Sequence, residues 1–142
     1  MATIEEIEKR RAARLADHDK ARLEQERVDL EAIDALEEAN GEPLHTMTAN
    51  GFKIGVPVKA AFRAPSGIEY KRYVDMVGKA QQKSDSVARV RAQELLAEVC
   101  WMYPAKDSDA RKAMFDAFPG VLISLAIEAA KIAELRSEAE GK

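Results

Sequence analysis

The residues that most often perform catalysis are sparse in this 142-residue chain. Its two histidines, His18 and His45, lie in different segments, and no carboxylate, serine or cysteine is spaced to complete a catalytic triad or a two-histidine metal site with them. The many carboxylates lie on densely charged stretches, where pKa values stay ordinary and no acid–base pair is indicated. We therefore predict that the chain is not an enzyme and uses no metal or cofactor.

The single cysteine and the glycine-containing segment indicate no chemistry either. Cys100 is alone, which excludes an internal disulfide and a zinc site built on thiolates. It lies in an apolar helical run, so we interpret it as a small buried side chain rather than a reactive thiol. Residues 50–57 (NGFKIGVP) lack the spacing and the Lys-Ser/Thr pair of a phosphate-binding loop. These residues therefore favour a binding module.

Composition and charge limit the class of partner. A net charge of −3 gives no general attraction to nucleic acid, and the turn that precedes a recognition helix is missing before residues 88–98. No N-terminal segment resembles a signal peptide. No apolar run reaches the ~20 residues that span a bilayer, since Glu128 and Lys131 interrupt the longest one. We therefore expect one domain in the cytoplasm, with no nucleic-acid partner and no membrane.

A long helix opens the chain. Residues 3–39 contain no proline or glycine, begin with a capping pattern at Thr3 and end at Asn40-Gly41. Residues 1–40 carry a net charge of −5, from seven basic and twelve acidic side chains. Their apolar side chains form two thin groups, first Ile4, Ile7 and Leu15, then a better-formed group of Leu23, Leu30 and Ile33. We predict an appendage or an oligomerisation helix whose contacts are made by the second group.

The middle of the chain combines a β-hairpin with excess positive charge. Residues 44–49 and 52–62 flank Asn50-Gly51, the strongest short hairpin turn. Pro57 cannot donate to a ladder, so either the second strand is at an edge or its pairing ends before Pro57. Residues 53–91 hold nine basic side chains against three acidic ones. The acidic N-terminal helix can dock on this region, within a chain or between chains, or both can stay solvated.

Two helices follow the hairpin. A Ser66 cap begins the first, and the polar run of residues 79–85 predicts either a frayed helix end or a loop. Ser84 or Ser86 caps the second, residues 87–103, which a proline ends because the residue before a proline avoids α geometry. Its apolar stripe is wide and comprises Val87, Val90, Leu95, Val99 and Met102, with Leu96, Cys100 and Tyr103 beside them. Its predicted solvent-facing side chains are Arg89, Arg91, Glu94 and Glu98.

The chain ends in a short and a long helix. Asp107 or Ser108 caps the short one, and the step Phe118-Pro119-Gly120 opens the long one, which is apolar nearly all round at first. We therefore predict a mainly α fold with one β-hairpin, in which a long N-terminal helix (residues 1–40) precedes a C-terminal helical bundle (residues 41–142). The last helix and the hairpin face carry more apolar surface than one small domain covers, so we also predict a homo-oligomer.

The order of features over residues 53–135 resembles a known family. A strand with alternating apolar residues leads to Arg63-Ala64-Pro65 and a Tyr-x-x-Tyr helix. A helix ending at Tyr103-Pro104 follows, and then Phe118-Pro119-Gly120 before an apolar terminal helix. In this order the chain resembles the tail assembly chaperones of long-tailed bacteriophages, which are encoded just ahead of the tape measure protein. Its N-terminal helix is longer than the resemblance leads one to expect.

The resemblance implies a non-enzymatic protein of the host cell cytoplasm that coats the tape measure protein and recruits tail tube subunits. In that family a ribosomal frameshift often makes a second, longer product, and the polar residues 136–142 would suit a junction. The long N-terminal helix leaves a second interpretation open, namely a structural virion protein of the tail or neck that oligomerises through it. A small host-encoded regulator or adaptor is a third.

Aromatic side chains are the expected partner contacts, since a few aromatic anchors dominate binding between a helix and a groove. The candidates in this chain are Tyr70, Tyr73, Trp101, Tyr103 and Phe118. Each of them has an alternative interpretation as an ordinary core residue, and that interpretation is favoured for Trp101 and Phe118.

Overall fold

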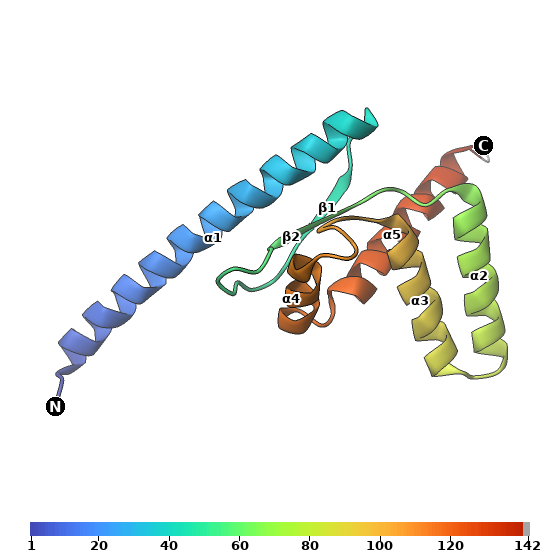
Figure 1. Cartoon of the computed structure of the whole chain (residues 1–142). Coiled ribbons are helices and arrows are strands. Elements are labelled where there is room, and N and C mark those ends of the chain that lie inside the picture. The colour runs from blue at the N-terminus through green and yellow to red at the C-terminus, as the bar shows by residue number, and fades with distance from the viewer. Residues whose placement is uncertain (141–142) are drawn as a thin grey trace.

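The computed structural model describes the backbone of residues 1–140 and the side chains as far as Leu135. Within that range the protein is mainly helical with one small sheet, which confirms the predicted fold class (Figure 1). The elements in chain order are α1 (Ile4–Asn40), β1 (His45–Thr48), β2 (Lys59–Phe62), α2 (Gly67–Gln82), α3 (Ser86–Cys100), β3 (Trp101–Tyr103), α4 (Asp109–Ala117) and α5 (Val121–Glu140). The polar end proposed as a junction, residues 136–142, lies outside the described side chains.

Helix α1 begins and ends where the sequence predicts. The Thr3 hydroxyl oxygen accepts a hydrogen bond of 3.1 Å from the backbone N–H of Glu6. Gly41 adopts a left-handed φ of 73°, and its N–H donates to Glu37 O at 2.8 Å. Only the C-terminal half of α1 lies along the sheet, whereas the N-terminal half runs away from the rest of the molecule (Figure 1). Residues 3–20 are all exposed.

The sheet is antiparallel in the order β1-β2-β3, so β2 is its central strand. Strands β1 and β2 pair Thr48 with Lys59, which makes residues 49–58 the connection between them. The predicted tight turn at Asn50-Gly51 is therefore wrong. Pro57 has no N–H and is buried together with both its neighbours, so this segment packs inward instead of extending the ladder. Neither alternative for Pro57 is observed, because β2 is the central strand and its pairing begins after Pro57, at Lys59.

Strand β3 is the element that the sequence analysis missed. Helix α3 ends at Cys100, so the helix predicted over residues 87–103 is too long at its C-terminal end. Pro104 keeps Tyr103 away from α geometry, and bulky aromatic side chains suit a strand. β3 pairs with β2, and the N–H of Arg63 extends that contact to Cys100 O at 2.9 Å. The Tyr103-Pro104 peptide bond that follows is cis.

Helices α2 and α3 form a hairpin with a short turn. The predicted capping box is present: the Ser66 hydroxyl accepts from Glu69 N at 3.2 Å, and Glu69 accepts from Ser66 N at 2.8 Å. Helix α2 continues to Gln82, so most of the polar run predicted as a frayed end or a loop is helical. Asp85 rather than a serine caps α3, since its carboxylate accepts a hydrogen bond of 3.0 Å from Ala88 N. Ser84 lies in the turn with a left-handed φ of 51°, and Ser86 is the first residue of the helix. At α4, the predicted cap Ser108 is confirmed.

The buried face of α3 is only one part of the wide apolar stripe that was predicted, the part with Leu96 and Cys100. Mainly small side chains face the core: Ala92, Leu96, Ala97 and Cys100. Alanines at a contact let helix axes approach closely, which leaves the larger side chains of α3 outside. Exposed residues of the predicted stripe are Val87, Val90, Leu95 and Val99. On the predicted solvent face, Glu94 and Glu98 are only half-exposed, and Glu98 pairs with the buried Arg111.

The core lies between the sheet and helices α3, α4 and α5. Its largest fully buried side chains include Phe62, Trp101, Met114 and Leu125. Burial of each such side chain contributes about 1.5–3 kcal/mol. This packing covers the apolar residues of β2 and one side of the described part of α5, whereas Ile127 and Leu135 stay exposed. The homo-oligomer stays a prediction.

Candidate partner-binding site

A groove with a volume of about 280 Å³ runs between α2 and α3. Eight side chains line it: Glu69, Arg72, Tyr73, Met76, Ala92, Leu95, Leu96 and Val99. Ala92 and Leu96 are buried and form its floor, whereas Met76, Leu95 and Val99 are 37%, 45% and 39% exposed. The α2–α3 groove therefore combines an apolar floor with apolar walls that a partner side chain can reach.

A bidentate ion pair fixes one end of the groove. Arg63 Nη1 donates to Glu69 Oε1 at 2.7 Å, and Nη2 donates to Glu69 Oε2 at 2.8 Å and to Val99 O at 2.9 Å. Hydrogen bonding from Arg63, with a further bond from the N–H of Ser66, lowers the pKa of Glu69 to about 2. Arg63 thus ties the start of α2 to the end of α3 and holds the groove at a set width.

The two tyrosines predicted on α2 lie beside each other. Tyr73 lines the groove and is half-buried. Tyr70 is also half-buried, with its ring centroid 6.5 Å from that of Tyr73. The structure brings these two predicted site residues together, while the other three lie on β3 and after α4.

Trp101 and Phe118 pack with the core, as the alternative interpretation favoured. Trp101 is 2% exposed, and its indole N–H donates to Pro104 O at 2.6 Å. Its ring contacts Phe115 edge-on at 5.3 Å, and the guanidinium of Arg111 lies 5.0 Å from its centroid. Phe118 is half-buried against the same cluster. Trp101 therefore cannot contact a partner while the chain is folded.

Tyr103 serves a buried carboxylate that the sequence analysis missed. Asp29 is fully buried and accepts hydrogen bonds at Oδ1 from Gln25 Nε2 at 3.0 Å and from the Tyr103 hydroxyl at 2.7 Å. Its Oδ2 accepts from the backbone N–H of Val58 at 2.8 Å and of Lys59 at 3.1 Å. Burial, together with the bond to Asp29, raises the pKa of Tyr103 well above its usual value. Asp29 thus joins α1 to the sheet.

The spacing of residues along α1 could have indicated that Asp29 lies on the buried face of the helix. The face of α1 that meets the sheet carries residues at steps of three and four: His18, Arg22, Gln25, Asp29 and Ile33. A search for apolar periodicity passes over this face because most of its members are polar. The question of where the acidic helix docks is also answered: α1 binds within the chain, through backbone N–H groups rather than basic side chains.

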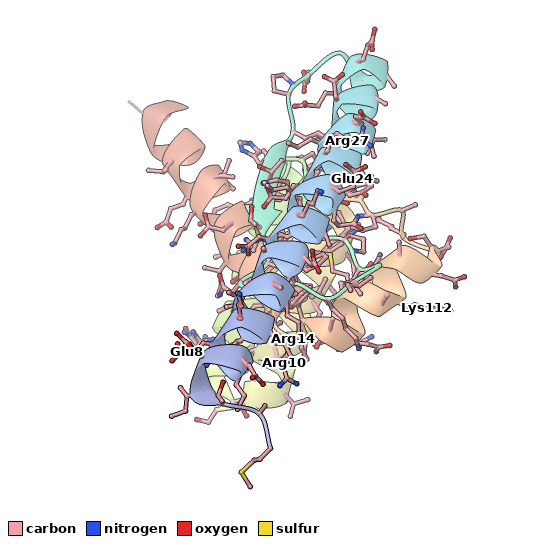
Figure 2. The ribbon with its side chains drawn as sticks, turned by 90° about the vertical axis from the view of Figure 1, so that its left-hand side faces the viewer. Glu8, Arg10, Arg14, Glu24, Arg27 and Lys112 are labelled. Carbon is pink, nitrogen blue, oxygen red and sulfur yellow. The ribbon has the colours of Figure 1, made fainter. Side chains whose placement is uncertain are left out.

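The predicted oligomerisation residues fall on two sides of α1. Leu23 and Leu30 are 66% and 49% exposed, whereas Ile33 is 2% exposed because it packs within its own chain. Leu23 and Leu30 flank Arg27, which pairs with Glu24 and Glu31. Figure 2 shows Glu24 and Arg27 close together on this outer part of the helix. Leu23 and Leu30 therefore remain available to a second molecule, and Ile33 does not.

The two histidines and the single cysteine, which indicated no catalytic chemistry in the sequence, pack against neighbouring side chains or lie in the core. His18 packs edge-on against Phe52 at 4.9 Å, and His45 lies 5.5 Å from the ring of Phe62. Burial raises the pKa of the Cys100 thiol to about 11, so the thiol stays protonated at neutral pH. Among the described residues, no three His, Cys, Asp or Glu side chains are grouped to hold a metal ion. Over the same range no single helix is long and apolar enough to cross a membrane, although α4 and α5, bent by 96°, pass that test as a pair.

None of the family models, curated proteins and solved structures compared with the chain matches it. The resemblance to tail assembly chaperones therefore rests on the sequence features given above. Two surfaces of the molecule are open to a partner, namely the α2–α3 groove and the exposed N-terminal half of α1.

Proposed function

We propose that the chain is a non-enzymatic tail assembly chaperone of a long-tailed bacteriophage. In this proposal it binds the tape measure protein in the host cell cytoplasm, keeps it from aggregating and helps to recruit tail tube subunits. The observation that supports the proposal is the α2–α3 groove, whose exposed walls are Met76, Leu95 and Val99.

An apolar groove between two helices suits an amphipathic helix of a partner. Side chains at steps of three and four residues on such a helix point to one side, so they can enter the groove in succession. Tyr73 supplies an aromatic anchor in the wall, and the exposed Arg72 at the rim favours an acidic residue beside the apolar ones. Because the Arg63–Glu69 pair already holds the helices in place, binding orders few groups and loses little affinity to that cost.

Co-expression with the tape measure protein of the same genome tests this proposal. We expect the partner to stay soluble and to elute with the chain as one complex, whose mass light scattering gives. Leu95→Glu places a charge in the groove wall and should reduce recovery of the complex by about tenfold or more. Adding tail tube protein to the complex then tests recruitment.

The matched control is Val87→Glu, because Val87 is also exposed on α3 but lies outside the groove. It should leave recovery of the complex unchanged. If the partner aggregates in the presence of the wild-type chain, the chaperone proposal fails. If both variants capture the partner as well as wild type, the groove is not the binding site.

A structural virion protein of the tail or neck is the second candidate. The observation that favours it is the projecting N-terminal half of α1, which carries three exposed large apolar side chains: Ile4, Ile7 and Leu15. An assembly factor leaves the particle, whereas a structural protein stays in it. Quantitative mass spectrometry of purified particles distinguishes the two, since only the structural protein is present in a fixed number of copies.

A further inference from the structure

The face of α1 that binds the sheet continues into the free half of the helix. Before His18, the same steps of three and four residues give what we call the free stripe, residues Ile4, Ile7, Arg11 and Leu15. The body covers this face only as far as His18, whose ring contacts Phe52. Ile4 and Leu15 are 76% and 55% exposed, so large apolar side chains at both ends of the free stripe lie in solvent.

We propose that the free stripe binds the free stripe of a second copy of this chain, with the two α1 helices antiparallel. The register follows from aligning the free stripe with the reversed free stripe of the second copy. Full antiparallel overlap of residues 4–15 with the same residues of a second copy places Ile4 opposite Leu15 at both ends. The same register places Glu8 opposite Arg11, twice, near the centre.

The charges of the free segment fit this register. Acidic residues come first (Glu5, Glu6 and Glu8), and basic residues follow (Lys9, Arg10, Arg11 and Arg14). Figure 2 shows Glu8 on one flank of α1 and Arg10 and Arg14 on the other. Antiparallel pairing sets the acidic start of each helix against the basic stretch of the other. A parallel pair in register would instead oppose Arg11 to Arg11 inside the contact, which like-charge repulsion disfavours.

A second copy fits this surface better than an unrelated helix does. A helix with an acidic block followed by a basic block is complementary to itself when reversed, whereas an unrelated partner has no reason to share that order. Space allows the arrangement as well. In Figure 1 the N-terminal half of α1 projects from the rest of the chain, which contacts the helix from His18 onward. In the antiparallel pair the two bodies would therefore lie at opposite ends of the paired segment.

The contact is short and carries charge at its centre. Interfaces of such small area are generally weak and transient, so we expect a dimer whose population depends on protein concentration. Salt screens exposed charges, so added salt should weaken it. The arrangement goes beyond the proposed function and does not depend on which partner the α2–α3 groove binds.

Sedimentation equilibrium of the full-length chain tests the pairing with charge reversals. Arg11→Glu or Glu8→Arg alone turns two attractive contacts into two repulsive ones and should raise the dimer Kd by about tenfold. The double variant restores opposite charges and should return the Kd to within about threefold of wild type. Residues 3–20 are exposed, so circular dichroism should show all these variants to be folded.

Lys9→Glu is the matched control for Arg11→Glu, because it makes the same change in net charge on the opposite side of the helix. It should leave the Kd unchanged. A double variant that dimerises no better than the single variants would overturn the proposal. A second result would also overturn it, namely a monomeric chain whose charge reversals change capture of the tape measure protein. The free stripe would then bind that partner instead of a second copy.

Cysteine cross-linking tests the orientation. A mixture of Ile4→Cys and Leu15→Cys chains should form a disulfide faster than either variant alone, since the antiparallel register brings these two positions together. The native Cys100 is buried and should not compete. Faster linkage of Ile4→Cys to itself would indicate a parallel pair and would overturn the antiparallel register.

Discussion

Helices α3 and α1 are attached to the rest of the molecule by different kinds of contact. Helix α3 packs on α2 and α5 and buries Ala92, Leu96, Ala97 and Cys100, so its stabilisation is spread over a broad surface. Helix α1 makes its fully buried contacts through one carboxylate, Asp29, and one apolar side chain, Ile33, and His18 adds an exposed ring contact to Phe52. Apolar burial therefore keeps α3 in place, whereas the position of α1 depends mainly on the geometry of one polar side chain.

The largest expected loss of stability comes from the core. Trp101→Ala removes a side chain that is 2% exposed, together with its contacts to Phe115 and Arg111, and should lower the free energy of unfolding by about 4 kcal/mol. Urea titration followed by circular dichroism measures this. Ile68→Ala, at an exposed position of α2, should change stability by less than about 0.5 kcal/mol. Equal losses in both variants would contradict a core centred on Trp101.

Where α1 meets the sheet, we expect the replacement of a single atom of Asp29 to lower stability strongly. Asp29→Asn keeps the shape but turns one acceptor into a donor that faces N–H or O–H groups, so it should cost about 2–3 kcal/mol. The exposed Asp34 on the same helix provides the control, because Asp34→Asn should change stability by less than about 0.5 kcal/mol. A neutral Asp29→Asn variant would show that α1 is held by something other than this carboxylate.

The Arg63–Glu69 pair should make stability depend on pH. The pKa of Glu69 is about 2 in the folded chain against an ordinary 4.5, so the unfolded chain takes up this proton first as the pH falls. Its contribution is complete above about pH 4.5 and is lost between about pH 4.5 and 2. We expect about 1 kcal/mol, because Arg63 is partly exposed.

The measurement is the difference in unfolding free energy between wild type and Glu69→Gln at several pH values. That difference should shrink as the pH falls through this window. Asp75→Asn, at an exposed position on the same helix, should show no such trend. A difference that stays constant with pH would contradict the assigned pairing.

The smallest expected effect on stability concerns the hydrogen bond between Tyr103 and Asp29, which joins the sheet to α1. Tyr103→Phe removes one of the four donors to Asp29 and should cost about 1 kcal/mol. In an Asp29→Asn background the same change should cost less, because the two side chains share one contact. Strict additivity in this double-mutant cycle would mean that Tyr103 stabilises the fold independently of Asp29.

Local signals in the sequence predicted most of the helical frame. The caps at Thr3, Ser66 and Ser108 act over a few residues, so they can be predicted from neighbouring positions. The Asn50-Gly51 turn failed because burial around Pro57 outweighs the local preference for a tight hairpin. Strand β3 was missed because three residues are too few to show a period, and its pairing partner β2 lies far away in the chain.

The candidate site was predicted in part for the same reason. The Tyr-x-x-Tyr spacing placed Tyr70 and Tyr73 on one helix, where the structure has them together. The groove itself depends on which side chains of the wide α3 stripe face outward. Leu96 and Cys100 are buried with two alanines, whereas Leu95 and Val99 face outward. Asp29 could not be recognised as buried, because a carboxylate inside the protein is stabilised by groups from two distant segments.

The attachment of α1 near residue 29 makes the helix a lever. At a rise of about 1.5 Å per residue, the tip at Ile4 lies roughly 37 Å from Asp29. A rotation of about 5° at that point therefore moves the tip by about 3 Å, which is comparable to the rise of two residues. Angular precision at one buried carboxylate thus sets the positional precision of a distant helix end. A substitution at Asp29 should widen the range of positions that the N-terminal end of α1 takes, even where the chain remains folded.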